Sequence, residues 1–214
     1  MLNLSSMNSM HLDAIREIGN IGAGNAATAM STLLGCPVEI DIPKAEFVSI
    51  YELDSYYDDP ESIYTAVFAS SDNEDPFNFM LLVKENEVGK LVSLLVSKQF
   101  GMEMDMASMS QEMVDSALGE VGNILLGSFL NAVNELLGVA SGITTPSVTH
   151  DMLASILSVV SAMFGEYGDI ALVTKSNMVV GTGKNVDSLD ANILLASGPQ
   201  ALESLLVKLG VMQR

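Results

Sequence analysis

The sequence predicts an α+β fold in which one helix–strand–strand–strand–helix unit occurs twice. The first observation behind this is an internal repeat: a shift of 103 residues places residues 13–43 on residues 116–146, and 12 of these 31 positions are identical. The second is a long apolar-periodic helix pattern at the start of each copy. The third is a set of short β-branched segments bounded by turn residues. We therefore expect residues 1–214 to form one domain of two repeats, about 9–100 and 110–210, related by a pseudo-twofold axis.

Each copy begins with a helix, predicted at residues 9–34 and 110–137. A glycine follows each one, Gly35 and Gly138, as is common where a helix ends. A shorter helix closes each copy, at residues 87–98 and 199–209, and residues 101–109 read as the connector. The final helices of the two copies match at a shift of 111 rather than 103, so the second copy is about eight residues longer. Residues 151–164 predict one additional helix there.

Three extended segments are predicted between the helices of each copy. Their β-branched residues and the Asp, Asn, Pro and Gly residues that flank them favour strands joined by turns. The predicted strands are residues 38–50, 63–70 and 77–83 in the first copy, and residues 140–148, 169–174 and 191–197 in the second. We expect them to form an antiparallel sheet on which the two long helices pack.

Composition narrows the possible partners. The chain has 49% apolar residues, 27 acidic residues against 9 basic ones, and a net charge of −18. Such a charge repels nucleic acid and anionic membranes, so we expect neither as a partner; a basic protein surface is one interpretation of the charge and simple solubility is the other. One cysteine and two histidines predict no disulfide framework and no metal site. No signal peptide or membrane span is apparent, which favours the cytoplasm.

Both long helices repeat the same polar stripe. At about 100° per residue, Asp13, Glu17 and Asn20 fall on one face of the first helix, opposite its apolar arc. Ser116, Glu120 and Asn123 fall on the same face of the second helix. A single stripe of this kind is usually only a solvated surface. Here apolar positions differ between the copies while Glu and Asn are identical, although exposed polar residues normally contribute little to stability. This favours a functional role.

Glycines accompany the stripes and have two possible explanations. Gly19 and Gly122 directly precede the asparagines, and each costs a helix interior roughly 0.5–1 kcal/mol relative to alanine. Either they allow two helices to cross closely, or they keep the surface low so that a partner protein approaches the stripe. Both explanations remain open at this stage.

The stripe chemistry suits the positioning of a water molecule. No Ser–His, Cys–His or close carboxylate pair is present for nucleophilic or acid–base catalysis. A carboxamide both donates and accepts hydrogen bonds, so it can orient a water when the substrate carries its own metal and a labile phosphoryl group. A neighbouring glutamate suits a salt bridge to a lysine of the partner.

These residues resemble the signature of the CheC family of chemotaxis phosphatases. In that family, Asp or Ser, then Glu after three residues, then Asn after two more, begins each of two homologous helices. Asp13, Glu17 and Asn20 meet the pattern, as do Ser116, Glu120 and Asn123. The run Gly-Asn-Ile-Gly-Ala-Gly-Asn-Ala-Ala at residues 19–27 is also similar to the family, and the resemblance extends over nearly the whole chain.

The resemblance implies a substrate, a partner and a mechanism. The substrate would be phosphorylated CheY, whose receiver domain supplies Mg²⁺, so the chain would need no cofactor of its own. Asn20 and Asn123 would orient the attacking water, and Glu17 and Glu120 would pair with the receiver's lysine. The neighbouring residues Asp13, Ser116, Gly19 and Gly122 would contact the substrate protein. The family also binds the receptor deamidase CheD, and Asp151 is placed similarly to a CheD contact. We thus expect a monomer or a heterodimer with CheD; the alternative is a non-catalytic adaptor that binds CheY and CheD.

Overall fold

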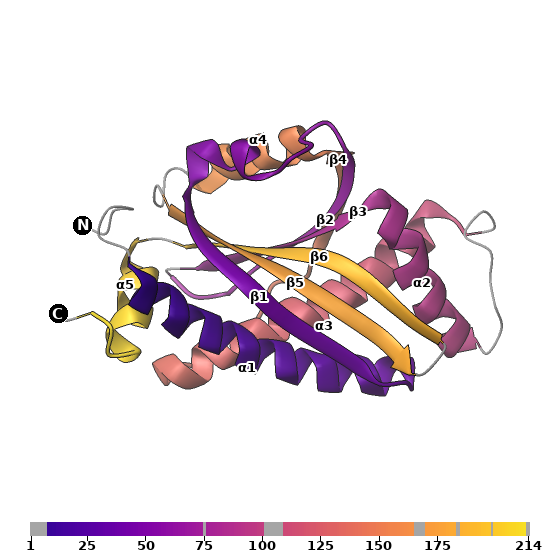
Figure 1. Cartoon of the computed structure of the whole chain (residues 1–214), viewed down its shortest axis with the longest axis horizontal. Helices are drawn as coiled ribbons and strands as arrows, with labels where there is room; N and C mark the ends of the chain where they lie inside the picture. Colours follow the sequence, from indigo (N-terminus) through magenta and orange to yellow (C-terminus); the bar gives the residue numbers. More distant parts are fainter. Residues whose placement is uncertain are drawn as a thin grey trace.

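The two long helices lie on one face of a six-stranded antiparallel sheet. The computed structural model describes residues 8–74, 76–100, 109–164, 170–182, 185–197 and 199–212. The long helices are α1 (Ser9–Leu34) and α3 (Gln111–Leu137), and they contact each other beneath the sheet (Figure 1). Two shorter helices, α2 (Glu85–Phe100) and α5 (Pro199–Lys208), also contribute to this layer. The α+β class predicted from the sequence is confirmed.

The ends of the long helices follow from local chemistry. Asn8 caps α1, because its side chain accepts a hydrogen bond from the backbone N–H of His11 and its own N–H donates to the His11 ring. Ser110 caps α3 by accepting from the N–H of Met113. Gly35 and Gly138 end the helices with φ of 59° and 69°, the left-handed region that favours glycine.

The strands are hydrogen-bonded in the order β1-β5-β6-β3-β2-β4, and each neighbouring pair in the described part of the chain is antiparallel. If β1, β2 and β3 are exchanged with β4, β5 and β6, respectively, the same order results when it is read from the opposite edge of the sheet. The strands are β1 (Val38–Ser49), β2 (Ile63–Ser70), β3 (Phe77–Lys84), β4 (Ser147–Met152), β5 (Ile170–Thr182) and β6 (Asn185–Ser197).

Hydrophobic cores cover both faces of the sheet. On β2, Val67 and Ala69 face the layer of long helices, whereas Tyr64 and Ala66 face the other side, as the two-residue period of a strand requires. The second face is covered by α4 (Leu153–Phe164) and by two short 3₁₀ turns, η2 (Ile50–Glu52) and η3 (Asp54–Tyr56) (Figure 1). This arrangement leaves the outer faces of α1 and α3 for function.

Several element boundaries differ from the sequence prediction. The predicted strand at residues 140–148 is wrong for most of its length, because the strand that forms is Ser147–Met152. The preceding residues instead bind the β2–β3 turn: Thr144 N–H donates to Ser70 O at 2.8 Å, and Asp72 N–H donates to Gly142 O at 3.0 Å. Pro146 has no N–H for a ladder.

Three further boundaries were predicted incorrectly. Helix α4 starts at Leu153 rather than at residue 151, because residues 151 and 152 still pair with β2. Strands β5 and β6 are about twice as long as predicted, since they extend as one hairpin through polar residues that had been interpreted as turns. The connector predicted at residues 101–109 lies, except for Met109, outside the described residues.

Candidate functional site

The first stripe is exposed along α1. Asp13, Glu17 and Asn20 are all exposed, while Ile15 and Ile18 on the opposite arc are buried. Within the stripe, Asp13 also forms an ion pair with Arg16, with Oδ1 3.0 Å from Nη2. The side chains of Glu17 and Asn20 therefore stand one helical turn apart on a surface open to a partner.

The second stripe lines a groove. Ser116, Glu120 and Asn123 are exposed on α3, and they face the segment of residues 143–148 across a groove of ≈ 580 Å³. Ser116 and Glu120 also border a second hollow of ≈ 550 Å³, whose apolar lining includes Leu33 and Leu95. Glu120 consequently lies on a ridge between two hollows, which is a suitable place for a side chain that contacts a partner protein.

The glycines beside the asparagines have a packing role. Gly19 and Gly122 are buried, so neither contributes to the exposed stripe. A Cβ atom on Gly122 would lie 2.4 Å from Val67 Cγ1 of β2, and one on Gly19 would lie 3.1 Å from Ile42 Cδ1 of β1. A Cβ atom on Gly22 would lie 3.0 Å from the Cα of Phe129 on α3.

These glycines lie in close packing, but the nearest neighbours of Gly19 and Gly122 are strands of the sheet, and it is Gly22 that lies where α1 crosses α3. Contact of Gly19 and Gly122 with the substrate protein stays a prediction; in the structure both glycines are buried, and a Cβ on either would point toward the sheet. Because these glycines have no Cβ, α1 and α3 can approach the sheet closely. This approach sets the position of the neighbouring Asn20 and Asn123.

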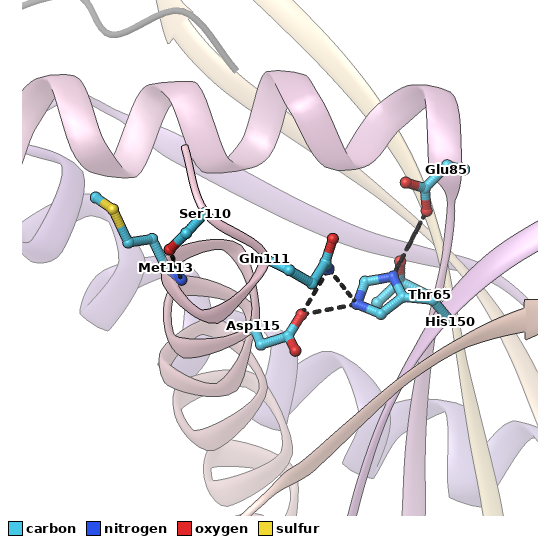
Figure 2. Close-up of polar contacts among 7 residues, drawn as sticks. All are labelled: Thr65, Glu85, Ser110, Gln111, Met113, Asp115 and His150. Atoms are coloured by element: carbon cyan, nitrogen blue, oxygen red, sulfur yellow. Dashed lines mark hydrogen bonds and ion pairs between the residues drawn. The ribbon is translucent and has the colours of Figure 1, made fainter. Parts of the chain in front are cut away.

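An ionisable network lies at the start of the α3 stripe (Figure 2). His150 Nε2 is 2.8 Å from Asp115 Oδ1, and His150 Nδ1 is 2.8 Å from Thr65 Oγ1. Thr65 Oγ1 donates to Glu85 Oε2 at 3.1 Å, and Gln111 Nε2 donates to Asp115 Oδ1 at 2.9 Å. The network joins α3, β4, β2 and the first residue of α2.

This network lowers the pKa of one carboxyl group that lines the groove. Desolvation raises the pKa of the Asp115 carboxyl, but hydrogen bonds from Gln111 and His150 outweigh it, so that the pKa is lowered overall. Asp115 also lines the α3 groove, directly before Ser116. Sequence reasoning missed Asp115 and His150, because neither belongs to the repeated stripe. A comparison of the two copies at positions where they differ would have found them.

Asp151 is exposed on β4, at the edge of the described sheet. Its carboxylate accepts a hydrogen bond from the N–H of Met152 at 2.7 Å. Strand β4 pairs only with β2 in the described sheet, so its other edge has no strand partner there.

Within the described residues, no three His, Cys, Asp or Glu side chains gather as they would around a metal ion. None of the described helices combines the length and apolarity needed to cross a bilayer. Each stripe offers one amide that can donate and accept, with a carboxylate one turn away. This set can orient a water and bind a cationic group.

Comparisons with known proteins agree with the site. The model of the CheC-like family matches residues 10–45 and 113–150, which contain the two stripes. The chain is 26% identical over 200 residues to the CheY-P phosphatase CheC of Bacillus subtilis (strain 168), covering 93% of each protein. It is 28% identical over 142 residues to the flagellar motor switch phosphatase FliY of the same organism, covering 64% of this chain and 32% of FliY.

A solved structure shares the fold. The crystal structure of Thermotoga maritima FliY superposes with a TM-score of 0.73 at 20% sequence identity, covering 97% of this chain and 99% of that one. At this identity the likeness concerns the fold alone.

Proposed function

We propose that the chain is a phosphatase of the CheC-like family that hydrolyses the aspartyl phosphate of the chemotaxis response regulator CheY. The observation that carries the proposal is the occurrence of the same Glu and Asn pair, exposed one turn apart, on both α1 and α3. The relative that covers 93% of this chain is named a CheY-P phosphatase, which supports the same substrate.

In the proposed reaction, Asn20 or Asn123 holds a water in line with the phosphorus atom of the acyl phosphate. The carboxamide oxygen accepts a hydrogen bond from the water, and its N–H group donates to a phosphoryl oxygen or to the water. Attack forms a new P–O bond and breaks the bond to the aspartyl oxygen, which releases inorganic phosphate and the free carboxylate. The receiver supplies Mg²⁺, and positioning is the contribution of this chain.

Glu17 and Glu120 dock the receiver in this proposal. Each is exposed and carries a single negative charge one turn before its asparagine. A salt bridge to the receiver's lysine would hold the acyl phosphate next to the amide. The net charge of −18 also attracts a basic partner surface over a longer range.

Two sites in one chain are proposed to result from internal duplication. The repeat in the sequence supports this, as does a strand order that is unchanged when the two sets of three strands are exchanged. The two copies would then be related by a pseudo-twofold axis, with β3 and β6 paired between them.

Phosphate release from phosphorylated CheY tests the proposal. We expect Asn20→Ala and Asn123→Ala each to retain part of the activity, and the double variant to lose about 10²-fold at each site, since that is the effect of one positioned amide. Asn25→Ala is a matched control, because Asn25 is an exposed asparagine of α1 outside the stripe. Full activity in the double variant would show that the asparagines are not catalytic.

A second candidate function is that of an adaptor that binds CheD and CheY without catalysis. The exposed Asp151 on the edge strand β4 favours a second binding surface. Under this alternative, wild-type protein would not accelerate dephosphorylation of CheY, while Asp151→Ala would weaken CheD binding. We propose CheD binding at Asp151 alongside catalysis, and the two assays separate the functions.

A further inference from the structure

His150 is held between two carboxylates that come from different helices. Its Nε2 atom faces Asp115 on α3, at 2.8 Å from Oδ1. Its Nδ1 atom faces Thr65 at 2.8 Å and lies 3.7 Å from Oε2 of Glu85, the first residue of α2 (Figure 2). Asp151, next along β4, belongs to the opposite face of the strand. Both ring nitrogens of His150 thus point at acceptors.

The hydrogen bonds of this network require a particular protonation state of the His150 ring. Oδ1 of Asp115 accepts only, so the contact at 2.8 Å requires a proton on Nε2. Thr65 has one hydroxyl proton, and it donates that proton to Glu85. Nδ1 must then also carry a proton in order to donate to Thr65. Only the doubly protonated, positively charged ring satisfies all three hydrogen bonds.

Gln111 fits the same state. Its Nε2 lies 3.0 Å from His150 Nε2, but it also lies 2.9 Å from Asp115 Oδ1, and the amide donates to that carboxylate. In the neutral ring, either Nε2 would present a lone pair to Asp115, or Nδ1 would take the Thr65 proton away from Glu85. Loss of the ring proton therefore breaks at least one link of the network. In every neutral form it also takes the positive charge out of the contact with Asp115, and a hydrogen bond between two charged groups is stronger than one from a neutral donor.

The network joins the two walls of the α3 groove. One wall is the helix that carries Asp115, Ser116, Glu120 and Asn123, and the other is the segment of residues 143–148, which continues directly into His150 on β4. The contact between His150 and Asp115 ties α3 to β4 at one end of this groove. A change in this contact alters the spacing of the walls, and hence the position of the stripe relative to a docked protein.

The first copy has an apolar pair at the equivalent positions. At the repeat shift of 103, Leu12 corresponds to Asp115 and Phe47 corresponds to His150. Leu12 and Phe47 are both partly buried and pack against the same cluster, which includes Ile15 and Leu172. Leu12 and Phe47 are both apolar, so this pair has no proton to gain or lose.

We propose that His150 is a positioning residue for the site on α3, and that its ionic contact with Asp115 makes this site dependent on pH while the site on α1 is not. The site on α3 is fully formed when the ring is charged and loses activity as the pH rises. Histidine is the side chain that ordinarily changes charge between about pH 5 and 8. The inference rests on the proposed phosphatase function.

Single-site variants test the proposal. Asn20→Ala leaves only the α3 site, and Asn123→Ala leaves only the α1 site. Their rates on phosphorylated CheY are measured from pH 5.5 to 8.5, and the ratio of the two rates cancels any pH dependence of the receiver itself. We expect the ratio of α3-site to α1-site activity to fall about tenfold with rising pH, the effect of one hydrogen bond to a charged group.

A swap of the pair provides the matched variant. Asp115→Leu with His150→Phe, made in the Asn20→Ala chain, installs the apolar pair of the first copy. We expect its activity ratio to be independent of pH. A ratio that is flat in the unswapped chain, or that still falls in the swapped one, would overturn the proposal. Absence of activity in both single-site variants at every pH would instead contradict the phosphatase function.

Nitrogen-15 NMR of the wild-type chain gives a readout that does not depend on activity. We expect both ring nitrogens of His150 to be protonated at low pH, and the backbone amides of Ser116 and Glu120 to shift with the same midpoint as the ring. Titration of the ring without any change at these amides would show that His150 does not position the stripe.

Discussion

Gly122 offers a direct test of how the core positions Asn123. In a Gly122→Ala variant, the new Cβ would lie 2.4 Å from Val67 Cγ1 and 3.1 Å from Val67 Cβ. Ordinary carbon–carbon contacts are about 3.5–4.0 Å, so α3 must move away from β2 by roughly 1 Å. Val67 is fully buried and β-branched, and it cannot rotate out of the way easily.

The expected magnitude follows from two opposing effects. Overpacking a core costs about 1–3 kcal/mol, and alanine gains about 0.5–1 kcal/mol over glycine inside a helix. Because the overlap with Val67 is severe, the cost of overpacking should exceed the gain in helix propensity. We expect the free energy of unfolding to fall by about 1–2 kcal/mol. For a chain of this size that lowers Tm by about 2–8 °C. The shift of α3 should also reduce activity at Asn123.

Urea and thermal unfolding measure the stability. Gly119→Ala is the matched control, because a Cβ there meets nothing within 4 Å, and it should raise stability by about 0.5–1 kcal/mol. A Val67→Ala change removes the clashing methyl groups, so in that chain Gly122→Ala should lower the free energy of unfolding much less. The double-mutant cycle measures the coupling energy between the two positions. Gly122→Ala as stable as wild type would refute the packing role of the glycine.

Three further predictions concern binding, metal and acid. Glu17→Ala with Glu120→Ala should weaken binding to CheY carrying a stable phosphate mimic more than the two Asn→Ala changes do, because a partly desolvated interfacial ion pair is costly to break; unchanged affinity in a titration would remove the docking role. The isolated chain should bind no stoichiometric Mg²⁺ or Zn²⁺ by calorimetry and should not hydrolyse p-nitrophenyl phosphate, since each stripe has a single glutamate beside an amide; tight metal binding with hydrolysis would favour a metallophosphatase. Because its folded-state pKa is lowered, Asp115 contributes stability that is present above its unfolded pKa and lost as pH falls through the folded pKa. Asp115→Asn should therefore lose less stability than wild type below about pH 4 in acid unfolding, and identical acid curves would contradict this.

Local sequence signals were sufficient to predict the bounds of the two long helices and of β2. The ends of α1 and α3 depend on residues within one turn, namely the caps at Asn8 and Ser110 and the glycines Gly35 and Gly138. Such short-range chemistry is visible in the sequence, and the helical spacing of Glu and Asn follows from the same regularity. Both stripes are indeed exposed.

Longer-range pairing decided the elements that sequence reasoning got wrong. Residues 140–146 have strand-like composition, yet their backbone groups bond to Ser70 and Asp72 at the turn after β2. The polar halves of β5 and β6 form strands because they pair with each other, and β5 also pairs with the twelve-residue strand β1. Strand propensity depends on such neighbours, which the sequence does not specify locally.

The sequence by itself determined the repeat, the two long helices and the Glu and Asn stripes, because each of these is a regular pattern along one element. Only the tertiary structure decided that Gly122 packs against Val67, and that His150 meets Asp115 and Glu85. Those contacts join residues 55, 35 and 65 positions apart in the chain. The two residues of each contact come together through the order of the strands in the sheet and the packing of α3 on it. No periodic pattern within a single segment encodes that arrangement.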